Sequence, residues 1–517
     1  MPLPFKESEM GAVSTAMDQR AIKTETEIFP ERSPKAARKE LFPSTGSPSL
    51  SVSVQTFYSF LKRKPAGVRL ERKKEASLLH WSIKRPYPPE KIRVPVPETS
   101  LPCVRVGAII QVGQAIAVPI PIIPPTGREG AVPTAVTEKK LKIGTEARGP
   151  EGVSVHAGMS GTVGKIAMFP DALGGESLMI EILRQGETKV IPSPLPETRK
   201  GWNETPVEEL LRSFQHSGLV ATDPSMEPVH AKLQRHAGAR AVIINGCEPE
   251  PYLTCEQALI LSHPVEILKG AELLRKACGA EKIIFALENS NLEMVELIRS
   301  KIYFLKWKHA KVRTVPALYP QGLESTLFQG WFPGNEEEAA TFPASTAFAA
   351  YEAIALGKPF YERIVTVGGE CVVEPRSLWL PLGISFQDAI HACKGVMRKP
   401  RKVLMGGPMA GTAQTTLEVP VMAGTNAILG LPQEIVREAI EEPCIRCNLC
   451  ADHCPVSLSP AMITLAAEQK EFEIAAEYDV ADCIECGNCA FVCPSKRPMT
   501  ELIRRARVLA PRTATRG

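Results

Sequence analysis

The sequence predicts a multidomain α/β protein, and three observations carry that prediction. Residues 200–360 alternate apolar, strand-like runs with amphipathic, helix-like runs, a pattern typical of a parallel α/β sheet. Residues 80–190 hold short strand-like runs separated by Gly and Pro turns. Near the C-terminus, most of the 14 cysteines fall into two matching runs joined by a helical pattern.

The two cysteine runs are the most specific feature of the chain. They read CIRCNLCADHCP and CIECGNCAFVCP, and both have the spacing C-x2-C-x2-C-x3-C-P. This spacing is that of bacterial two-cluster ferredoxins, in which the fourth cysteine of each run ligates the other cluster. We therefore expect two 4Fe–4S clusters that carry single electrons. The first is assigned to Cys444, Cys447, Cys450 and Cys493, and the second to Cys483, Cys486, Cys489 and Cys454.

Zinc is the alternative ligand for these cysteines. Zinc sites usually take two cysteine pairs, whereas each run here has four cysteines closed by a proline. Residues 458–478 and 500–510 have helical patterns. An α-helical dicluster ferredoxin domain is therefore predicted.

The α/β region is predicted element by element. Strand-like runs and helix-like runs alternate in the order expected for a parallel α/β sheet. Strands are expected at 240–246, 282–288 and 312–320, and helices at 265–279 and 291–302.

Two smaller β modules flank this region. Residues 105–117 and 155–166 look like the halves of a lipoyl-type barrel-sandwich, but an insertion from Pro119 to Ser154 replaces the lysine hairpin of a carrier, so a structural role is expected. Residues 363–375 predict two short strands around Gly368 and Gly369, and 385–393 predict a helix. This second module resembles a β-grasp ligand-binding unit, and the loop 401–413 follows it.

Composition limits the remaining possibilities. The net charge of +4 does not support nucleic-acid binding. No stretch reaches about 18 clean apolar residues and the N-terminus lacks a signal peptide, so we expect a cytoplasmic protein without a transmembrane segment. Most of the six cysteines outside the two runs are expected to be small buried residues.

The N-terminal residues are rich in Ser, Pro, Lys and Glu and predict a disordered tail. Its basic end, residues 61–74, could contact anionic lipid or an acidic partner, or remain a solvated linker. The predicted organisation is a tail (1–78), a barrel-sandwich-like domain (79–195), an α/β flavin/NADH-type domain (196–360), a β-grasp-like module (361–432) and the dicluster domain (433–510).

These motifs together resemble the C subunit of the Rnf ion-translocating electron-transport complex, over roughly residues 85–510. The motifs that carry the resemblance, ahead of the two cysteine runs, are HAGMSGTV (156–163), INGCEPEPYLT (244–254), YPQGLE (319–324), MGGPMAG (405–411) and GTNAIL (424–429). The flavin-type domain is also similar to the NADH-oxidising subunit of respiratory complex I. The resemblance implies a peripheral subunit on the cytoplasmic face of a membrane complex. It would pass electrons between a nicotinamide/FMN site and partner subunits, with ferredoxin at the other end of the chain.

The loop that corresponds to the family's flavin loop departs from the pattern. The family has roughly AGIVGLGGAGFPTHVKL, and this chain has SGLVATDPSMEPVHAKL (217–233). Pro224 offers no N–H to a phosphate, and Asp223 puts a carboxylate where a phosphate would lie, a repulsion of about 4 kcal/mol at ~4 Å near a surface. Ala221 and Met226 replace two further glycines. These changes oppose ordinary FMN binding at this loop.

Five residues remain candidates for an FMN or NADH site. They lie in NGCEPEPYL and YPQGLE, which keep most of the family's residues: Asn245, Glu248, Glu250, Gly322 and Glu324. The glutamates could instead be surface carboxylates at a strand end, and MGGPMAG predicts a tight packing turn. No catalytic residue is assigned, and His156 and His230 are given no chemical role.

Three functions remain open from the sequence. The first is an NADH-linked flavoprotein subunit that feeds two clusters. The second is an electron relay whose flavin-type domain no longer binds flavin. The third is a relative of the cobalamin reductase of propanediol-using microcompartments. Whether the chain itself oxidises NADH stays open.

Overall fold

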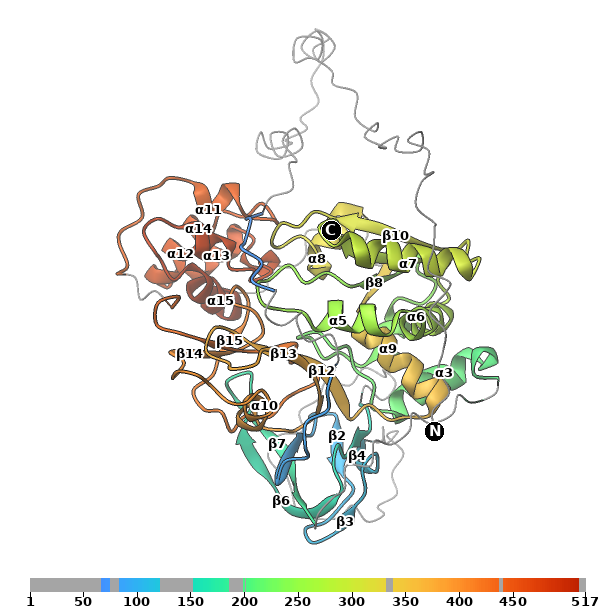
Figure 1. The fold of residues 1–517 in the computed structure, drawn as a ribbon. Helices are drawn as coiled ribbons and strands as arrows, with labels where there is room; N and C mark the ends of the chain where they lie inside the picture. The colour runs from blue at the N-terminus through green and yellow to red at the C-terminus, as the bar shows by residue number, and fades with distance from the viewer. Residues whose placement is uncertain are drawn as a thin grey trace, which may run out of the picture. The chain divides into compact units, whose positions relative to one another are not determined.

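The computed structural model describes residues 67–74, 83–120, 152–185, 199, 201–331, 338–436 and 440–510. The predicted tail up to residue 66 and most of the insertion after Pro119 lie outside these ranges. The described chain contains four β-sheets, one of them parallel, and a C-terminal group of short helices (Figure 1).

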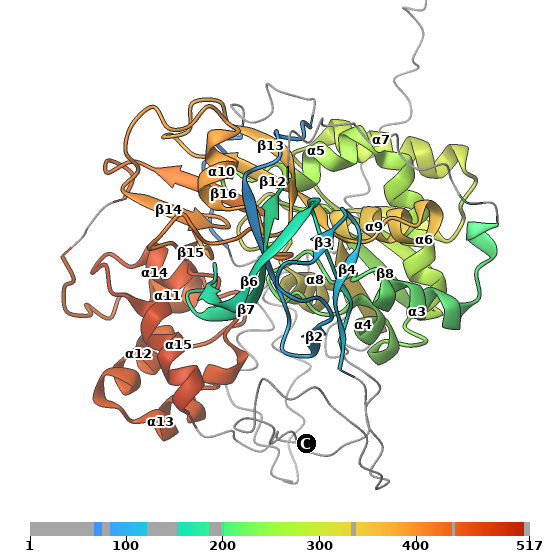
Figure 2. The ribbon, with the colours of Figure 1, turned by 90° about the horizontal axis from the view of Figure 1, so that it is seen from below.

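The predicted barrel-sandwich region forms two small antiparallel sheets (Figure 2). The first has the order β1 (Lys91–Pro95), β7 (Glu176–Arg184), β6 (Gly161–Pro170), β3 (Ile109–Ile110). The second has the order β2 (Ser100–Pro102), β4 (Ala115–Pro119), β5 (Val155–His156). Alternate β1 residues such as Ile92 and Val94 are buried, which is the period expected when one face of a strand meets a core. Both predicted halves therefore supply strands.

The α/β region has a fully parallel sheet, as the sequence predicts, with four strands where three were predicted. The third predicted strand ends at Val315 rather than at residue 320. Its order is β10 (Ala310–Val315), β9 (Lys282–Glu288), β8 (Ala241–Asn245), β11 (Ala339–Pro343). Its helices are α3 (Val207–His216), α4 (Val229–Arg235), α5 (Cys255–Ser262), α6 (Pro264–Cys278), α7 (Leu292–Phe304), α8 (Glu324–Trp331) and α9 (Ala344–Tyr351), with short turns at Trp202–Glu204 and Glu352–Leu356.

The predicted helices α6 and α7 are present. Helix α6 ends, and helix α7 begins, at residues that the sequence predicts. Gly279 follows α6 in the left-handed conformation, and the Asn291 side chain accepts a hydrogen bond from the Met294 N–H at the start of α7. Strand β11 and helix α9 were not predicted. Helix α9 approaches α6 so closely that a Cβ on Gly270 would lie 1.7 Å from the Ala347 carbonyl oxygen, so only glycine fits there.

The predicted β-grasp region forms a five-stranded sheet with one helix. Its order is β13 (Arg376–Pro381), β12 (Glu362–Gly368), β16 (Ala427–Leu431), β14 (Lys402–Met405), β15 (Thr412–Ala413), with α10 at Phe386–His391. The prediction of a second strand at 370–375 is wrong. Gly369 has a φ of +86° and starts a turn, so the strand that pairs with β12 begins only at Arg376. The loop 401–413 likewise contains two short strands.

The cysteine runs lie among short helices, drawn in red in Figure 1. These are α11 (Leu449–Asp452), α12 (Pro460–Gln469), α13 (Phe472–Glu477), α14 (Asn488–Val492) and α15 (Met499–Leu509), with a short turn at Val480–Asp482. Lys470, at a φ of +61°, splits the helical pattern of 458–478 into α12 and α13. Their apolar faces meet α15 around Ile463, Ala475 and Ile503.

Residues 67–74 depart from the prediction of a disordered tail. The Val68 N–H donates to the Tyr319 carbonyl (2.7 Å), and the Tyr319 N–H donates to the Val68 carbonyl (3.0 Å). The Tyr252 N–H donates to the Arg72 carbonyl (3.1 Å). Part of the basic cluster therefore contacts this chain itself. Among the described helices, none is long and apolar enough to cross a membrane.

Candidate functional site

The two cysteine runs have the same backbone conformation at matching positions. Left-handed residues follow the first cysteine of each run by two, four and thirteen positions. In the first run they are Arg446, Asn448 and Ser457, and in the second Glu485, Gly487 and Lys496. A non-glycine residue rarely adopts this conformation, so its repetition marks a backbone built for one purpose. Such turns direct N–H groups toward sulfur: Leu458 donates to Cys454 Sγ (3.3 Å) and Glu485 to Cys483 Sγ (3.4 Å).

The four cysteines assigned to the second cluster lie together. Cys454, from the first run, lines one cavity with Cys483, Cys486 and Cys489 of the second run. Burial raises the pKa of the Cys486 thiol to about 11 and that of Cys489 to about 12, and neighbouring thiols of this group contribute to both shifts. Cysteine binds a metal as the thiolate. The positive charge of a cluster's iron would stabilise the thiolate form, which burial disfavours. The donor set and its crossing between the runs fit a 4Fe–4S cluster.

The cysteines assigned to the first cluster have a more open setting. Cys450 and Cys493 are buried, Cys444 is half-buried and Cys447 is exposed. Burial raises the pKa of Cys450, and the nearby Cys444 adds to the shift. Among the described residues, no three His, Cys, Asp or Glu side chains are gathered closely enough to hold a single metal ion.

The candidate nucleotide residues follow the carboxyl ends of the parallel strands, where ligands bind in such sheets. Asn245 ends β8, and its side chain donates to the Gly322 carbonyl (2.7 Å) and accepts from the Cys247 N–H (3.0 Å). Gly322 has a φ of +103°, and a Cβ there would lie 2.7 Å from that of Cys247. The sheet edge therefore brings Asn245 and Gly322 together.

Glu248 and Glu250 are both buried, so they are not surface carboxylates. The two Glu248 oxygens accept hydrogen bonds from the N–H groups of Glu256 and Gln257 (both 3.0 Å), at the start of α5. A carboxylate stabilises a helix start because it meets unpaired N–H groups and the positive end of the helix dipole. Glu250 accepts from the Met409 N–H (2.7 Å) and holds the MGGPMAG turn. Burial raises the pKa of Glu250, and the hydrogen bond from the Met409 N–H opposes this rise.

Glu324 has a different kind of partner from Glu248 and Glu250. It accepts a hydrogen bond from the ammonium of Lys232 (2.9 Å), a side chain that is only 3% exposed. Burial, with the negative charges of Asp223 and Glu227, raises the pKa of Glu324 against the pull of Lys232. Three carboxylates therefore gather near the flavin-type loop, where Lys232 pairs with Glu324 and Arg235 pairs with Glu227.

The flavin-type loop is a closed turn. The Asp223 carboxylate accepts from the Ser225 N–H (2.9 Å), and Met226 has a φ of +47°. The buried guanidinium of Arg363 donates to the Thr222 carbonyl (2.8 Å). On the other side, a Cβ on Gly424 would lie 2.8 Å from the Asp223 carbonyl oxygen. The turn therefore packs tightly against the β-grasp region.

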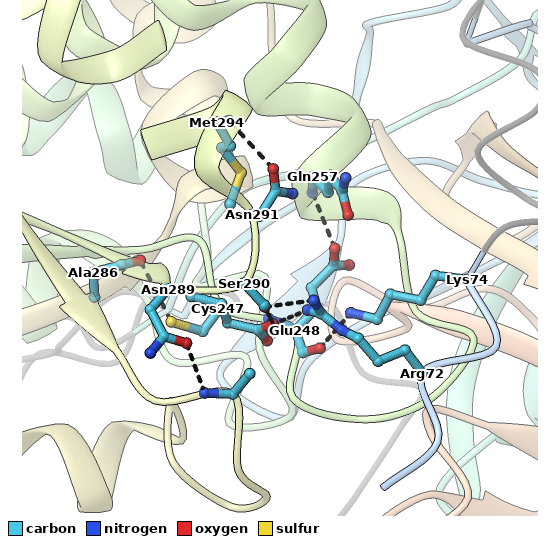
Figure 3. A network of polar contacts seen from close by, with 12 residues as sticks. Arg72, Lys74, Cys247, Glu248, Gln257, Ala286, Asn289, Ser290, Asn291 and Met294 are labelled. Atoms are coloured by element: carbon cyan, nitrogen blue, oxygen red, sulfur yellow. Dashed lines mark hydrogen bonds and ion pairs between the residues drawn. The ribbon is translucent and has the colours of Figure 1, made fainter. Parts of the chain in front are cut away.

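Sequence reasoning missed the contribution of residues 67–74 (Figure 3). Arg72 contacts the carboxylate of Glu288 and the hydroxyl of Ser290, and the Lys74 ammonium donates to the Glu248 carbonyl. Glu288, which is buried, also accepts from the Glu248 N–H (3.0 Å). Glu288 could have been found, because it ends the predicted strand 282–288 at the ligand-binding edge. No local signal pairs it with Arg72, which is 216 residues away.

The two histidines of the matched motifs are packed within the described chain. Both ring nitrogens of His156 lie at hydrogen-bond distance from backbone carbonyls, those of Gly113 (3.0 Å) and His216 (2.7 Å). His230 is buried within α4. Five of the six cysteines outside the runs are buried and Cys103 is exposed, as expected for most of them.

Three family models match the chain. The Nuo51 FMN-binding domain matches residues 214–349, the SLBB domain 364–413 and the 4Fe–4S dicluster domain 443–496. They cover the parallel sheet, part of the β-grasp region and the cysteine runs in turn. The chain is therefore a multidomain α/β protein with these three domains.

Curated relatives match over most of the chain. The C subunit of the proton-translocating ferredoxin:NAD(+) oxidoreductase complex of Clostridium ljungdahlii is 30% identical over 68% of this chain and 78% of its own length. The Na(+)-translocating counterpart of Acetobacterium woodii is 30% identical over 75% of this chain and 90% of its own length. The C subunit of the ion-translocating oxidoreductase complex of Rhodobacter capsulatus is 33% identical over 65% of this chain and 67% of its own length.

Solved structures match more distantly. Two structures of NAD+-reducing [NiFe]-hydrogenase match 64% and 63% of this chain and 67% of the matched chain, at 16% and 15% identity and TM-scores of 0.42 and 0.44. The first two curated relatives, in contrast, reach 30% identity over more than two thirds of both chains. The chain belongs to the family of C subunits of ion-translocating ferredoxin:NAD(+) oxidoreductase complexes.

Proposed function

We propose that this chain is an electron-transfer subunit of a membrane-associated, ion-translocating oxidoreductase complex. The observation that carries the proposal is the pair of cysteine runs with one repeated backbone conformation, inside a dicluster domain. The relatives that share this domain are named as subunits of ferredoxin:NAD(+) oxidoreductase complexes.

Two 4Fe–4S clusters are assigned to crossed sets of cysteines. The common cavity of Cys454 and the second run supports the set Cys454, Cys483, Cys486 and Cys489. By the same crossing, Cys493 completes the set of Cys444, Cys447 and Cys450.

When bound, such clusters supply reversible one-electron transfer without a proton-transferring side chain. The chain's own contribution is to hold, bury and tune them. Backbone N–H groups donate to the sulfurs of Cys454 and Cys483, and such bonds stabilise the more negative, reduced state. The exposure of Cys447 places the first set nearer to solvent, where a partner's redox group could approach.

The family supports a proposal for the place of the chain in the complex. We assign it to the cytoplasmic face as a peripheral subunit, in contact with other subunits of the complex. Ferredoxin and NAD(+) are the substrates in the names of two relatives, so they are the first partners to test.

A second candidate concerns the flavin. A relay that receives electrons from a partner protein, rather than from bound FMN, is favoured by the geometry of the flavin-type loop. The carboxylates of Asp223 and Glu227 lie near that of Glu324, which the Lys232 ammonium contacts, and Pro224 removes one N–H donor. An FMN phosphate would meet an acidic site there.

A cofactor count on anaerobically purified protein tests both candidates. Iron, acid-labile sulfide and released flavin are quantified per chain, and NADH is then added while cluster reduction is followed. About eight irons with one flavin and NADH-driven reduction support the flavoprotein subunit. About eight irons with no flavin and no response to NADH support the relay. Substantially fewer irons with bound zinc contradict the proposed function itself.

A further inference from the structure

One small core joins four distant parts of the chain beside the second cysteine run. It contains the buried residues Val68, Tyr319 and Cys486. Leu70, Leu323, Met409, Ile484 and Val492 pack around these three. The core thus combines the N-terminal segment, the YPQGLE loop after β10, the MGGPMAG turn and the Cys483–Cys489 loop.

Tyr319 makes the direct connection. Its side chain is 1% exposed, and its hydroxyl donates a hydrogen bond to the carbonyl of Cys486 (2.7 Å). Two backbone hydrogen bonds, of 2.7 and 3.0 Å, join the N–H and carbonyl groups of Tyr319 to those of Val68. A Cβ on Gly67 would lie 2.6 Å from the Tyr319 carbonyl oxygen, so this contact leaves no room for a side chain.

The MGGPMAG turn also approaches the same cysteine loop. The Glu250 carboxylate accepts from the Met409 N–H (2.7 Å), and a Cβ on Gly487 would lie 2.7 Å from the Met409 carbonyl oxygen. Gly487 directly follows Cys486. The peptides around Cys486 therefore contact Tyr319 on one loop and lie close to the MGGPMAG turn, which Glu250 holds.

The physical consequence concerns the cluster that Cys486 would ligate. Cluster potentials depend on hydrogen bonds near the sulfurs and on solvent exposure. The phenol O–H points its positive end toward the Cys486 peptide, and the Val68–Tyr319 pair covers that peptide with apolar atoms. Both effects act at Cys486, which belongs to the second set of cysteines.

We propose that Tyr319, covered by Val68 of the N-terminal segment, is a positioning residue that tunes and shields the cluster held by Cys454, Cys483, Cys486 and Cys489. It acts through the Cys486 peptide. The inference rests on the proposed function, since it requires bound clusters.

The test uses the full-length, cluster-loaded chain. Redox titrations monitored by electron paramagnetic resonance measure the two clusters separately in the Tyr319→Phe variant. Loss of the phenolic donor should lower the potential of one cluster, so that its reduced-to-oxidised ratio at a fixed potential falls roughly threefold or more, or about 28 mV. The affected signal should be the one that Cys486→Ala removes. Tyr303→Phe, at a side chain on α7 that is 80% exposed, is the matched control.

A second variant tests the cover. Val68→Asn should leave the iron content of freshly purified protein unchanged but make the same cluster lose its signal in air at least threefold faster. Val508→Asn, at an exposed valine of α15 in the dicluster domain, is the control. Equal shifts in both clusters, or none in either, overturn the inference. If the unmodified chain holds no pair of clusters, the proposed function fails and the inference with it, whereas two clusters with unmoved properties refute the inference alone.

Discussion

At the scale of single residues, buried carboxylates in this chain hold the chain's own backbone. Glu248 binds the first N–H groups of α5, and Glu250 holds the MGGPMAG turn. Glu256 accepts from the Ser345 N–H (2.8 Å) and from its hydroxyl, at the start of α9. The glutamates at this sheet edge therefore organise the loops where a cofactor would bind.

Glu256 carries a prediction for pH dependence. Burial, with the charge of Glu248, raises its pKa from 4.5 to about 7, although Ser345 and Arg363 oppose the shift. The folded chain then binds a proton that the unfolded chain has released, so stability from this group is full below pH 4.5 and is lost as the pH rises to about 7. Since one pKa unit corresponds to about 1.4 kcal/mol, the loss is at most roughly 3 kcal/mol.

The Glu256→Gln variant cannot ionise and should lack this dependence. Its apparent melting temperature, relative to that of the unmodified protein, should rise between pH 5 and pH 8, by about 2–4 °C for each kcal/mol. Glu296→Gln, at a side chain on α7 that is 68% exposed, should show no such trend. A constant difference across this pH range would disprove the assignment.

At the scale of elements, the flavin-type loop carries the second prediction. The triple variant Asp223→Gly, Pro224→Gly, Met226→Gly removes a negative charge and a side chain and restores one N–H donor. Flavin retained after reconstitution with FMN should rise at least tenfold over the unmodified chain, as measured by fluorescence of released flavin.

The control variant also introduces a glycine into this loop, but it leaves the charges of the loop unchanged. Ser225→Gly changes an exposed residue of the same turn. If this single change increases flavin retention as much as the triple variant, loop flexibility rather than phosphate geometry decides binding. If the triple variant retains no more flavin, the loop does not set flavin binding.

The two cysteine runs carry the third prediction, which tests their crossing. Cys454→Ala lies in the first run but should remove the cluster of the second run, because Cys454 lines the cavity of Cys483, Cys486 and Cys489. Iron should fall from about eight to about four per chain, and the lost paramagnetic signal should match that lost in Cys486→Ala. Cys103→Ala, outside both runs, should keep all iron. A match with Cys447→Ala instead would show that the runs do not cross.

At the scale of the whole molecule, residues 67–74 tie the N-terminal part of the chain to the sheet edge. Arg72 pairs with Glu288, whose side chain is 5% exposed, and Arg72→Ala would leave that buried carboxylate with fewer partners. Because Arg72 itself is 38% exposed, solvent weakens the pair, and a loss of about 1 kcal/mol is expected.

Thermal unfolding followed by circular dichroism checks this contact. Arg72→Ala should lower the apparent melting temperature by roughly 2–4 °C. Arg69→Ala removes the same charge from an exposed position in the same segment and should have no effect. Equal effects of the two variants would mean that the segment acts through net charge and not through its contact with Glu288.

The sequence by itself determined the features that depend on local pattern. Helix α6 could be predicted because its amphipathic pattern ends at Gly279. Strand β9 could be predicted because its inner residues, 283–287, are all apolar. The cluster cysteines could be predicted because ligands for one cofactor must share a short loop, and spacing alone records this. Helix α9 is Ala-rich and buried throughout, so it carries no amphipathic signal.

Only the tertiary structure decided what the remaining polar residues contact. The sequence left open what Glu248 and Glu250 contact, and the fold places backbone N–H groups against both. The basic residues Arg72 and Lys74 had several possible partners in sequence, and chain geometry selected Glu288 and the Glu248 carbonyl. Charge and hydrogen-bonding capacity are properties of a residue, whereas the partner that satisfies them depends on which distant segments the fold brings within about 3 Å.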